Sequence, residues 1–214
     1  MLIRQTDFDK RRNSSTLRLA LVGMSNIGKS YAAHRISQHK EFKKIEIDTL
    51  IQKQLGLPGM TDIASWMGFP WQEGYEENAR SYLDAEEHLT LADYGVGNLV
   101  LDTTGSVIHL PKKSVISIKN KYLCVYLKAN SKDRHRLKRT YFKHPKPTIW
   151  GVHYHKQTGQ TEKASLMACY PELLSARERL YEDLADITLS AHTCLKLCRS
   201  DGDILELIRD KLPD

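Results

Sequence analysis

The stretch from Gly23 to Tyr31, GMSNIGKSY, has a spacing that can surround a phosphate group. Four residues separate Gly23 from Gly28, and Lys29 and Ser30 follow directly. Glycines at these two positions allow a tight turn, so that successive backbone N–H groups and the positive end of a helix face an anion. Lys29 is then expected to reach the β- and γ-phosphates of a nucleotide, and Ser30 to bind Mg²⁺. The stretch therefore predicts a site for ATP and Mg²⁺.

The residues around this loop help to distinguish a phosphate site from a glycine turn that only caps a helix. An apolar run, LRLALV (17–22), precedes the loop and favours a strand, and KSYAAHRISQ (29–38) follows it and favours a helix. This strand–loop–helix order is the context that a P-loop requires. We therefore include Asn26, Ile27 and Tyr31 among the expected nucleotide contacts, with the capping turn as the alternative.

Two carboxylates stand where a second strand is expected to end. Glu46 and Asp48 are two residues apart in KKIEID (43–48), so both side chains point the same way if the strand includes them. One of them could orient the Mg²⁺ shell, and the other could accept the proton of a hydroxyl group. The alternative is that Asp48 caps the following helix.

A third strand end also has polar chemistry. NLVLD (98–102) resembles a Walker B strand, and its Asp102 could bind Mg²⁺ through water. Thr103, Thr104, Gly105 and Ser106 follow and could form a polar ledge beneath a substrate. An ordinary turn with local side-chain hydrogen bonds is the alternative.

Two arginines lie in segments with helical spacing. Arg80 stands among carboxylates, where an ion pair with Glu76 or Asp84 is the alternative to a binding role. Arg177 lies in a helical segment that leads to the last apolar run, and a surface ion pair is again the alternative.

The elements expected to position these residues are five apolar runs separated by helical segments. The runs are LRLALVG (17–23), KKIEID (43–48), NLVLD (98–102), YLCVYLKA (122–129) and DITLSA (186–191). Continuous apolar strands that alternate with helices favour a parallel sheet covered on both faces. Ligands of such sheets bind at the carboxyl ends of the strands, where the candidate residues stand.

Length and composition limit the class of protein. The chain has 214 residues, 41% of them hydrophobic, which favours one domain with a substantial core. No apolar run of ~18 residues indicates a membrane span, and the N-terminus has no secretory h-region. We expect a cytoplasmic protein with a loose polar arm over 1–16 and a single domain over 17–214. The four cysteines are not spaced as metal ligands and are expected to be buried thiols.

The net charge is +6, and the basic residues are concentrated in SKDRHRLKRTYFKHPKPTIW (131–150). Such a stretch could bind nucleic acid, or it could close over the phosphates of a bound nucleotide. The composition does not distinguish the two.

The order of these motifs resembles shikimate kinase, within the nucleoside-monophosphate-kinase branch of P-loop enzymes. The resemblance extends from about residue 17 to 191, and RERLYEDLAD (177–186) is its most similar piece outside the loop. It implies an α/β, three-layer P-loop kinase fold with a five-stranded parallel sheet of strand order 2-3-1-4-5. Helices would cover both faces, and a lid with an insertion would span about 131–165.

The resemblance also implies roles on the nucleotide side. Gly23, Gly28, Lys29 and Ser30 match the phosphate loop, and Glu46 matches the position beside Mg²⁺. Arg139 falls where an arginine stacks on adenine, and Lys146 where a lid arginine reaches the γ-phosphate. On the acceptor side, Asp48 matches the residue that meets the substrate hydroxyl, and Arg177 and Arg80 match two arginines that grip the shikimate carboxylate.

Several residues depart from the family pattern. Asn26 replaces a loop glycine, Glu46 replaces an aspartate, and Lys146 replaces an arginine and loses its planar fork. The triple glycine beneath the substrate is Thr103–Thr104–Gly105 in this chain. The segment 61–74 adds Trp66 and Trp71, either as an aromatic wall of the pocket or as core. We therefore expect a divergent acceptor pocket, because small changes in a polar pocket can switch substrates.

The leading hypothesis is an ATP-dependent kinase that phosphorylates a hydroxyl of a small anionic acceptor, with shikimate as the first candidate. One alternative is a nucleic-acid-linked ATP-binding protein or polynucleotide kinase, in view of the basic stretch. Another is a nucleotide-binding regulator without catalysis, in view of the altered glycines. We expect no membrane partner, and a monomer or weak dimer.

Overall fold

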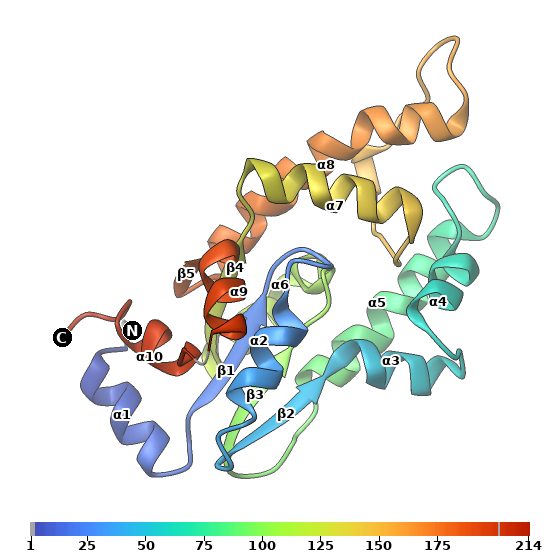
Figure 1. The fold of residues 1–214 in the computed structure, drawn as a ribbon. Helices are drawn as coiled ribbons and strands as arrows, with labels where there is room; N and C mark the ends of the chain where they lie inside the picture. Colours follow the sequence, from blue (N-terminus) through green and yellow to red (C-terminus); the bar gives the residue numbers. More distant parts are fainter. Residues whose placement is uncertain (1–2, 201) are drawn as a thin grey trace.

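The computed structural model describes residues 3–200 and 202–214, and its centre is a five-stranded parallel sheet (Figure 1). The strands are β1 (Arg18–Val22), β2 (Phe42–Glu46), β3 (Asn98–Asp102), β4 (Leu123–Lys128) and β5 (Ile187–Ser190). Their order across the sheet is β2-β3-β1-β4-β5, and every neighbouring pair is parallel. The predicted strand order and the α/β class are confirmed.

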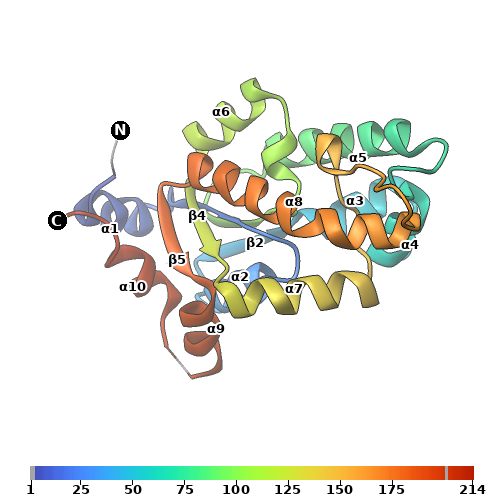
Figure 2. The same ribbon diagram turned by 90° about the horizontal axis from the view of Figure 1, so that it is seen from above.

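Helices surround this sheet as three-layer packing requires. They are α1 (Gln5–Asn13), α2 (Lys29–Ile36), α3 (Ile47–Leu55), α4 (Met60–Met67), α5 (Tyr75–Leu91), α6 (Lys112–Lys121), α7 (Ser131–Lys143), α8 (Glu162–Leu184), α9 (Ala191–Arg199) and α10 (Ile204–Arg209), with short 3₁₀ turns η1 (Val107–His109) and η2 (Gly151–His153). Seen from above, α2 and α9 lie on one side of the sheet, and α6 and α8 lie on the other (Figure 2). Strand residues are apolar on both faces because helices cover both.

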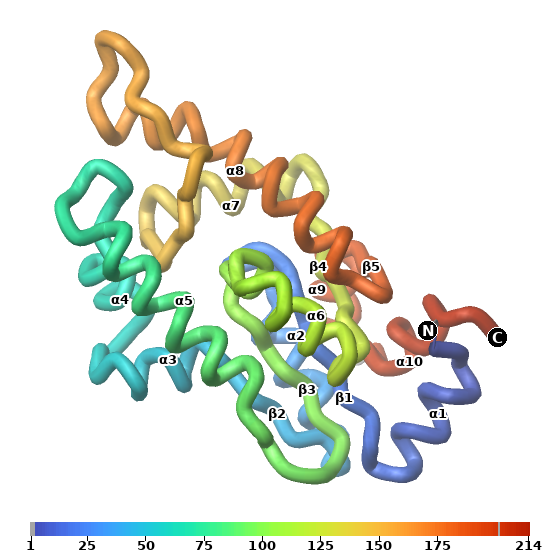
Figure 3. Tube along the Cα trace, turned by 180° about the vertical axis from the view of Figure 1, so that it is seen from behind, coloured from blue at the N-terminus to red at the C-terminus, as the bar shows by residue number. Residues whose placement is uncertain are grey.

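Two helical arms extend beyond the carboxyl ends of the strands. The arm formed by α3, α4 and α5 stands on one side, and α7 and α8 form the other, as the view from behind also shows (Figure 3). The basic stretch that the sequence left open forms α7 and the segment that follows it. It therefore stands beside the strand ends, where parallel sheets bind ligands.

The expected strand over 43–48 ends earlier than its apolar pattern suggests. β2 stops at Glu46, and Asp48 lies in the first turn of α3. Glu46 and Asp48 therefore do not extend side by side from one strand. The short tripeptide Glu46–Ile47–Asp48 contains the change from strand to helix, and Ile47 is fully buried there.

The segment expected as a loose arm over 1–16 contains helix α1 instead. Its one buried side chain, Phe8, is 0% exposed and belongs to the core. The backbone N–H of Gln5 donates to Pro213 O at 2.9 Å, and its side chain donates to Leu212 O at 3.1 Å. A single aromatic anchor and partners at the far end of the sequence therefore fix a segment whose own pattern is polar.

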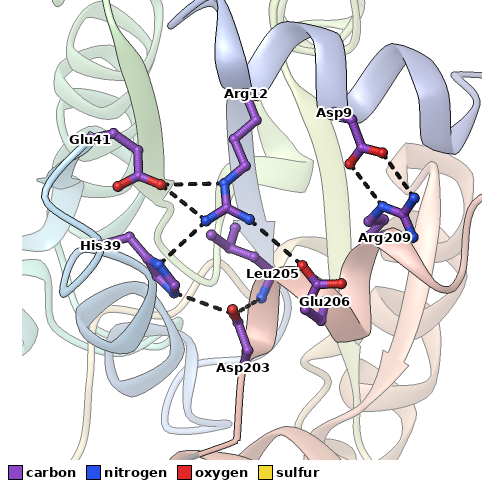
Figure 4. A network of polar contacts seen from close by, with 8 residues as sticks. All are labelled: Asp9, Arg12, His39, Glu41, Asp203, Leu205, Glu206 and Arg209. Carbon is purple, nitrogen blue, oxygen red and sulfur yellow. Dashed lines mark hydrogen bonds and ion pairs between the residues drawn. The ribbon is translucent and has the colours of Figure 1, made fainter.

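Ion pairs add to this contact between the two ends of the chain (Figure 4). Asp9 accepts two hydrogen bonds from Arg209, at 2.8 and 2.9 Å. Arg12 lies 3.1 Å from Glu41, in the turn that leads into β2. Helix α1 thus bridges α10 and the α2–β2 turn.

All four cysteines are buried and free, as expected. In the part of the chain that the structure describes, no helix combines the length and apolarity needed to cross a membrane.

Replacement of Phe8 by alanine tests whether α1 is part of the fold. We expect Phe8→Ala to lower the free energy of unfolding by about 3–5 kcal/mol, because a fully buried ring leaves a cavity. Urea unfolding followed by circular dichroism measures the change. Lys10→Ala, an exposed change in the same helix, should stay within ~0.5 kcal/mol of wild type. Equal stability of both variants would contradict the docked helix.

Candidate active site

The loop between β1 and α2 has backbone angles that its glycines make possible. Gly23 has φ +142°, and Gly28 has φ +114°. A Cβ at Gly28 would meet the Leu195 side chain at 2.8 Å, and a Cβ at Gly23 would lie 3.0 Å from Leu127 O. Asn26, which departs from the family pattern, has φ +64°, a left-handed conformation that asparagine tolerates better than most residues. Asn26 therefore preserves a turn that a glycine would also allow.

Lys29 begins α2 and lies folded back over this loop. Its side chain is 6% exposed, and Nζ donates to Gly23 O at 2.9 Å and to Met24 O at 3.2 Å. Burial lowers the pKa of Lys29, and the nearby Asp102 carboxylate opposes this shift. A phosphate at the loop would offset the same desolvation, because an opposite charge favours the protonated ammonium group.

A cavity of about 450 Å³ lies over the loop. Its lining comes from the loop, α2, α3, the end of β3, α7 and the segment after α7: Ser25, Asn26, Gly28, Lys29, Ser30, Tyr31, Asp48, Asp102, Thr103, Arg136, Thr140 and Lys146. The structure thus brings together nine residues that the sequence singled out: Asn26, Gly28, Lys29, Ser30, Tyr31, Asp48, Asp102, Thr103 and Lys146. Ile27 is buried beneath the loop and contributes to the core.

The two candidate metal carboxylates have different surroundings. Asp102 is buried at the end of β3, and burial raises its pKa, opposed by Lys29 and by a hydrogen bond from Ser30. Glu46, its neighbour across the β2–β3 pair, forms an ion pair with Lys44 at 3.1 Å. Ser30 and Asp102 together offer the hard oxygen donors that Mg²⁺ prefers. Within residues 3–200 and 202–214, no group of three or more His, Cys, Asp or Glu residues could hold a metal ion, so phosphate and water would complete its shell.

Asp48 and Lys146 face each other across the cavity. Lys146 Nζ lies 3.8 Å from Asp48 Oδ2, and both side chains are about one-third exposed. They come from opposite arms, since Asp48 starts α3 and Lys146 follows α7. The pair therefore spans the gap between the arms, above the phosphate loop.

Arg177 and Gly105 are in direct contact, as their shared assignment to the acceptor side suggests. Arg177 is 5% exposed, and its guanidinium donates to Gly105 O at 3.4 Å and to Ile149 O at 2.9 Å. The Tyr181 hydroxyl donates to the same Gly105 carbonyl at 2.5 Å. Arg177 also lines a second, smaller cavity of about 20 Å³ together with Lys146. The acceptor side is thus closely packed.

Two predicted arginines stay outside these cavities. Arg80 is exposed on α5, whose buried side is formed by Tyr75, Ala79, Tyr82, Ala85, Glu86 and Thr90. Arg139 is exposed on α7, but Arg136, one turn earlier, lines the larger cavity and donates to Asn26 O at 3.0 Å. Sequence reasoning missed Arg136, although its i,i+4 spacing with Thr140 places both on one helix face.

Glu86 is a second residue that the sequence analysis missed. It is 0% exposed, and it accepts hydrogen bonds from the Thr104 and Ser106 hydroxyls, the latter at 2.5 Å. Thr104, expected to contact substrate, therefore binds Glu86 behind the ledge, while Thr103 lines the cavity. Burial raises the pKa of Glu86 to about 7, opposed by the two hydroxyl hydrogen bonds. The sequence signal that could have revealed Glu86 is its place in the helical spacing of α5, on the side that is buried.

Comparison with known proteins shows what the chain is similar to. The shikimate kinase of Dehalococcoides mccartyi is 27% identical over 191 residues, which cover 87% of this chain and 92% of that protein. No protein-family model matches the chain.

Solved structures share the fold. Shikimate kinase from Acinetobacter baumannii in complex with shikimate aligns with a TM-score of 0.58 and 20% identity, over 91% of this chain and 98% of that one. Shikimate kinase from Aquifex aeolicus aligns with a TM-score of 0.53 and 14% identity, over 91% and 98% of the two chains. The chain is thus a homologue of shikimate kinase over most of its length and has the P-loop kinase fold. These relatives support a phosphotransferase that acts on an alcohol group.

The placement of Arg136 and Arg139 gives a test with a matched pair of variants. We expect Arg136→Ala to weaken binding of a non-hydrolysable ATP analogue about tenfold, because a charged hydrogen-bond donor leaves the cavity. Arg139→Ala should stay within about twofold of wild type, since its side chain is exposed. Isothermal titration calorimetry measures both. A larger loss for Arg139→Ala would instead support the adenine-stacking role that the resemblance implies.

Glu86 gives a pH-dependent prediction. Its folded-state pKa of about 7 lies above the ordinary 4.5, so the folded protein retains a proton that the unfolded chain releases. The contribution of Glu86 to stability therefore falls as pH rises from 4.5 to 7, by about 3 kcal/mol.

Glu86→Gln removes this titration, and its amide can accept from one of the two hydroxyls and donate to the other. Urea unfolding at pH 5 and pH 7.5 should show wild type losing about 2 kcal/mol more than the variant as pH rises. Parallel pH dependence of the two proteins would contradict a buried, proton-retaining Glu86.

Proposed function

We propose that this homologue of shikimate kinase transfers the γ-phosphate of ATP to a hydroxyl of a small anionic acceptor, with shikimate as the first candidate. The observation that supports this proposal most is the cavity over the loop, where Lys29 and Ser30 meet Asp48 and Lys146 from the two arms. The name of the 27% identical relative supports shikimate as acceptor.

The nucleotide side of the cavity has the donors that a triphosphate needs. Backbone N–H groups of the loop and the N-terminus of α2 face the phosphates, and Lys29 binds their oxygens. Ser30 and Asp102 would hold Mg²⁺. ATP with its metal ion supplies the phosphoryl group and neutralises part of its charge. The residues that line the cavity suit a magnesium-bound triphosphate, because they bring cationic groups, amide groups and hard oxygen donors together in one space.

Asp48 is the proposed orienting group and general base for the acceptor hydroxyl. It stands at the mouth of the same cavity, and its carboxylate can accept the hydroxyl proton as the new P–O bond forms. Lys146 lies 3.8 Å away and adds positive charge where the transferred group is most negative. The pair thus supplies a base and an electrostatic stabiliser on opposite sides of one gap.

Arg177 is the proposed partner of the acceptor's anionic group. An arginine binds a carboxylate through two parallel hydrogen bonds, and Arg177 is buried beside the Gly105 ledge. Its bond to Ile149 O ties it to the segment after α7, so acceptor binding would exchange this carbonyl for a carboxylate. Helix α7 with Arg136 and the following segment with Lys146 serve as a lid that excludes water from the cavity. Because both residues line this cavity, the lid interpretation of the basic stretch is favoured over nucleic-acid binding.

Release of ADP with and without shikimate tests the proposal. Purified protein with ATP and Mg²⁺ should release ADP in a shikimate-dependent manner, measured by a coupled assay. Asp48→Asn should lower kcat by ~10²–10⁴-fold and leave ATP affinity within about threefold, because the base acts on the acceptor. Lys29→Ala should abolish turnover and weaken ATP binding.

The outcomes separate the parts of the proposal. ATP binding without stimulation by shikimate would retain the nucleotide site and direct the search to other hydroxyl-bearing acids. Unchanged turnover in Asp48→Asn would remove Asp48 from the mechanism. Unchanged ATP affinity in Lys29→Ala would contradict the nucleotide site itself.

A further inference from the structure

The segment 146–150 lies between the arm formed by α3, α4 and α5 and the arm formed by α7 and α8, and it is held from both. On one side, the Tyr75 hydroxyl at the start of α5 accepts from Trp150 N at 2.9 Å and donates to Thr148 O at 2.9 Å. On the other side, Arg177 of α8 donates to Ile149 O at 2.9 Å. Successive residues of an extended chain point in opposite directions, which explains why 148 and 150 meet one helix and 149 the other.

Breaking the hydrogen bonds of the Tyr75 hydroxyl would cost free energy. Its side chain is almost fully buried, and burial raises its pKa to about 12, so the hydroxyl keeps its proton and remains a donor. Loss of the hydroxyl would leave two backbone groups, Trp150 N and Thr148 O, without the partner that they have here. Trp150 itself is 1% exposed and packs against Tyr141, Tyr154 and Tyr170, so water has poor access to its N–H.

The same segment determines where Lys146 stands. The Thr148 hydroxyl donates to Lys146 O at 2.9 Å, and Thr148 O is the acceptor of the Tyr75 hydroxyl. Lys146 then places its ammonium group 3.8 Å from Asp48 and in the lining of the nucleotide cavity. A continuous series of hydrogen bonds therefore runs from Tyr75 through Thr148 to the backbone of the cavity lysine.

We propose that Tyr75 is a positioning residue, whose hydroxyl fixes the backbone of segment 146–150 and so holds Lys146 over the nucleotide cavity opposite Asp48. This inference rests on the proposed phosphoryl transfer at the same site. It gives a role to Tyr75, a residue of the arm formed by α3, α4 and α5, in setting the geometry of the lid. Tyr75 touches neither nucleotide nor acceptor in this role and acts only through Lys146.

The test is a double-mutant cycle between Tyr75→Phe and Lys146→Ala. If Tyr75 acts through Lys146, each single variant should lower kcat about tenfold, and the double variant should be no slower than Lys146→Ala alone. The acceptor KM of Tyr75→Phe should stay within about threefold of wild type, whereas a general loss of structure would change kcat, KM and unfolding together. Multiplying effects in the double variant, or wild-type kcat in Tyr75→Phe, would overturn the inference.

Tyr154→Phe is the matched control. Tyr154 also packs against Trp150, in the same group of aromatic rings, and its hydroxyl donates to Glu162 rather than to segment 146–150. Its replacement removes the hydroxyl of a half-buried tyrosine in contact with Trp150. Wild-type kcat is expected for this variant, and a loss equal to that of Tyr75→Phe would show that any hydroxyl near Trp150 has the same effect.

Failure to phosphorylate any tested acceptor would contradict the proposed function but not the positioning role of Tyr75. Two measurements test that positioning role without any turnover. In a Trp66→Phe/Trp71→Phe background, Trp150 is the one tryptophan left in the sequence, and Tyr75→Phe should increase the quenching of tryptophan fluorescence by acrylamide severalfold. Tyr75→Phe should also weaken binding of an ATP analogue in the wild-type background but not in Lys146→Ala. Unchanged quenching, or equal weakening in both backgrounds, would overturn the positioning role.

Discussion

Close packing at Gly105 is the constraint on which the rest of the site depends. A Cβ at this residue would lie 2.5 Å from Ser25 Oγ and 3.0 Å from Ser25 N, so any side chain here would displace the Ser25 hydroxyl and press on the backbone of the phosphate loop. The Gly105 carbonyl, in turn, accepts hydrogen bonds from Arg177 and Tyr181 of α8. The loop, the ledge and helix α8 are thereby fixed relative to one another at one point.

Several charged side chains are buried around this point, and interactions with their neighbours offset part of the cost of burying them. Lys29 and Asp102 are both buried at the carboxyl end of the sheet and attract each other, which offsets part of the cost of desolvation. Glu86 lies further back, where hydroxyl groups satisfy its oxygens and burial favours its neutral form. Behind the ledge, therefore, a carboxyl group supports the backbone of the acceptor side without adding a full negative charge to it.

The sequence predicted the sheet well because its signals are local. Each strand is a short apolar run, and the strand order followed from the resemblance that these runs and the loop supported. Lys29, Ser30 and Asp102 were found for the same reason, since strand ends and glycine spacing place them. The residues that line the loop side of the cavity could thus be predicted almost completely from the sequence.

The remaining residues depend on contacts between distant segments. Arg136 rather than Arg139 reaches the cavity because the rotation of α7 is set by its packing on α8, which no spacing within α7 reveals. Glu86 and Tyr75 depend on how α5 meets the ledge and the segment after α7. Arg80 matched the family only in order along the chain, and the face of α5 that it occupies is exposed.

The contact between α1 and α10 also has a consequence for folding. Asp9 and Arg209 are 200 residues apart in the sequence, and the loop that their contact closes contains all five strands β1–β5. Closing so long a loop costs conformational entropy, and contacts between distant residues form slowly. Joining α1 to α10 is therefore expected to be a late step of folding, and it takes place away from the cavity.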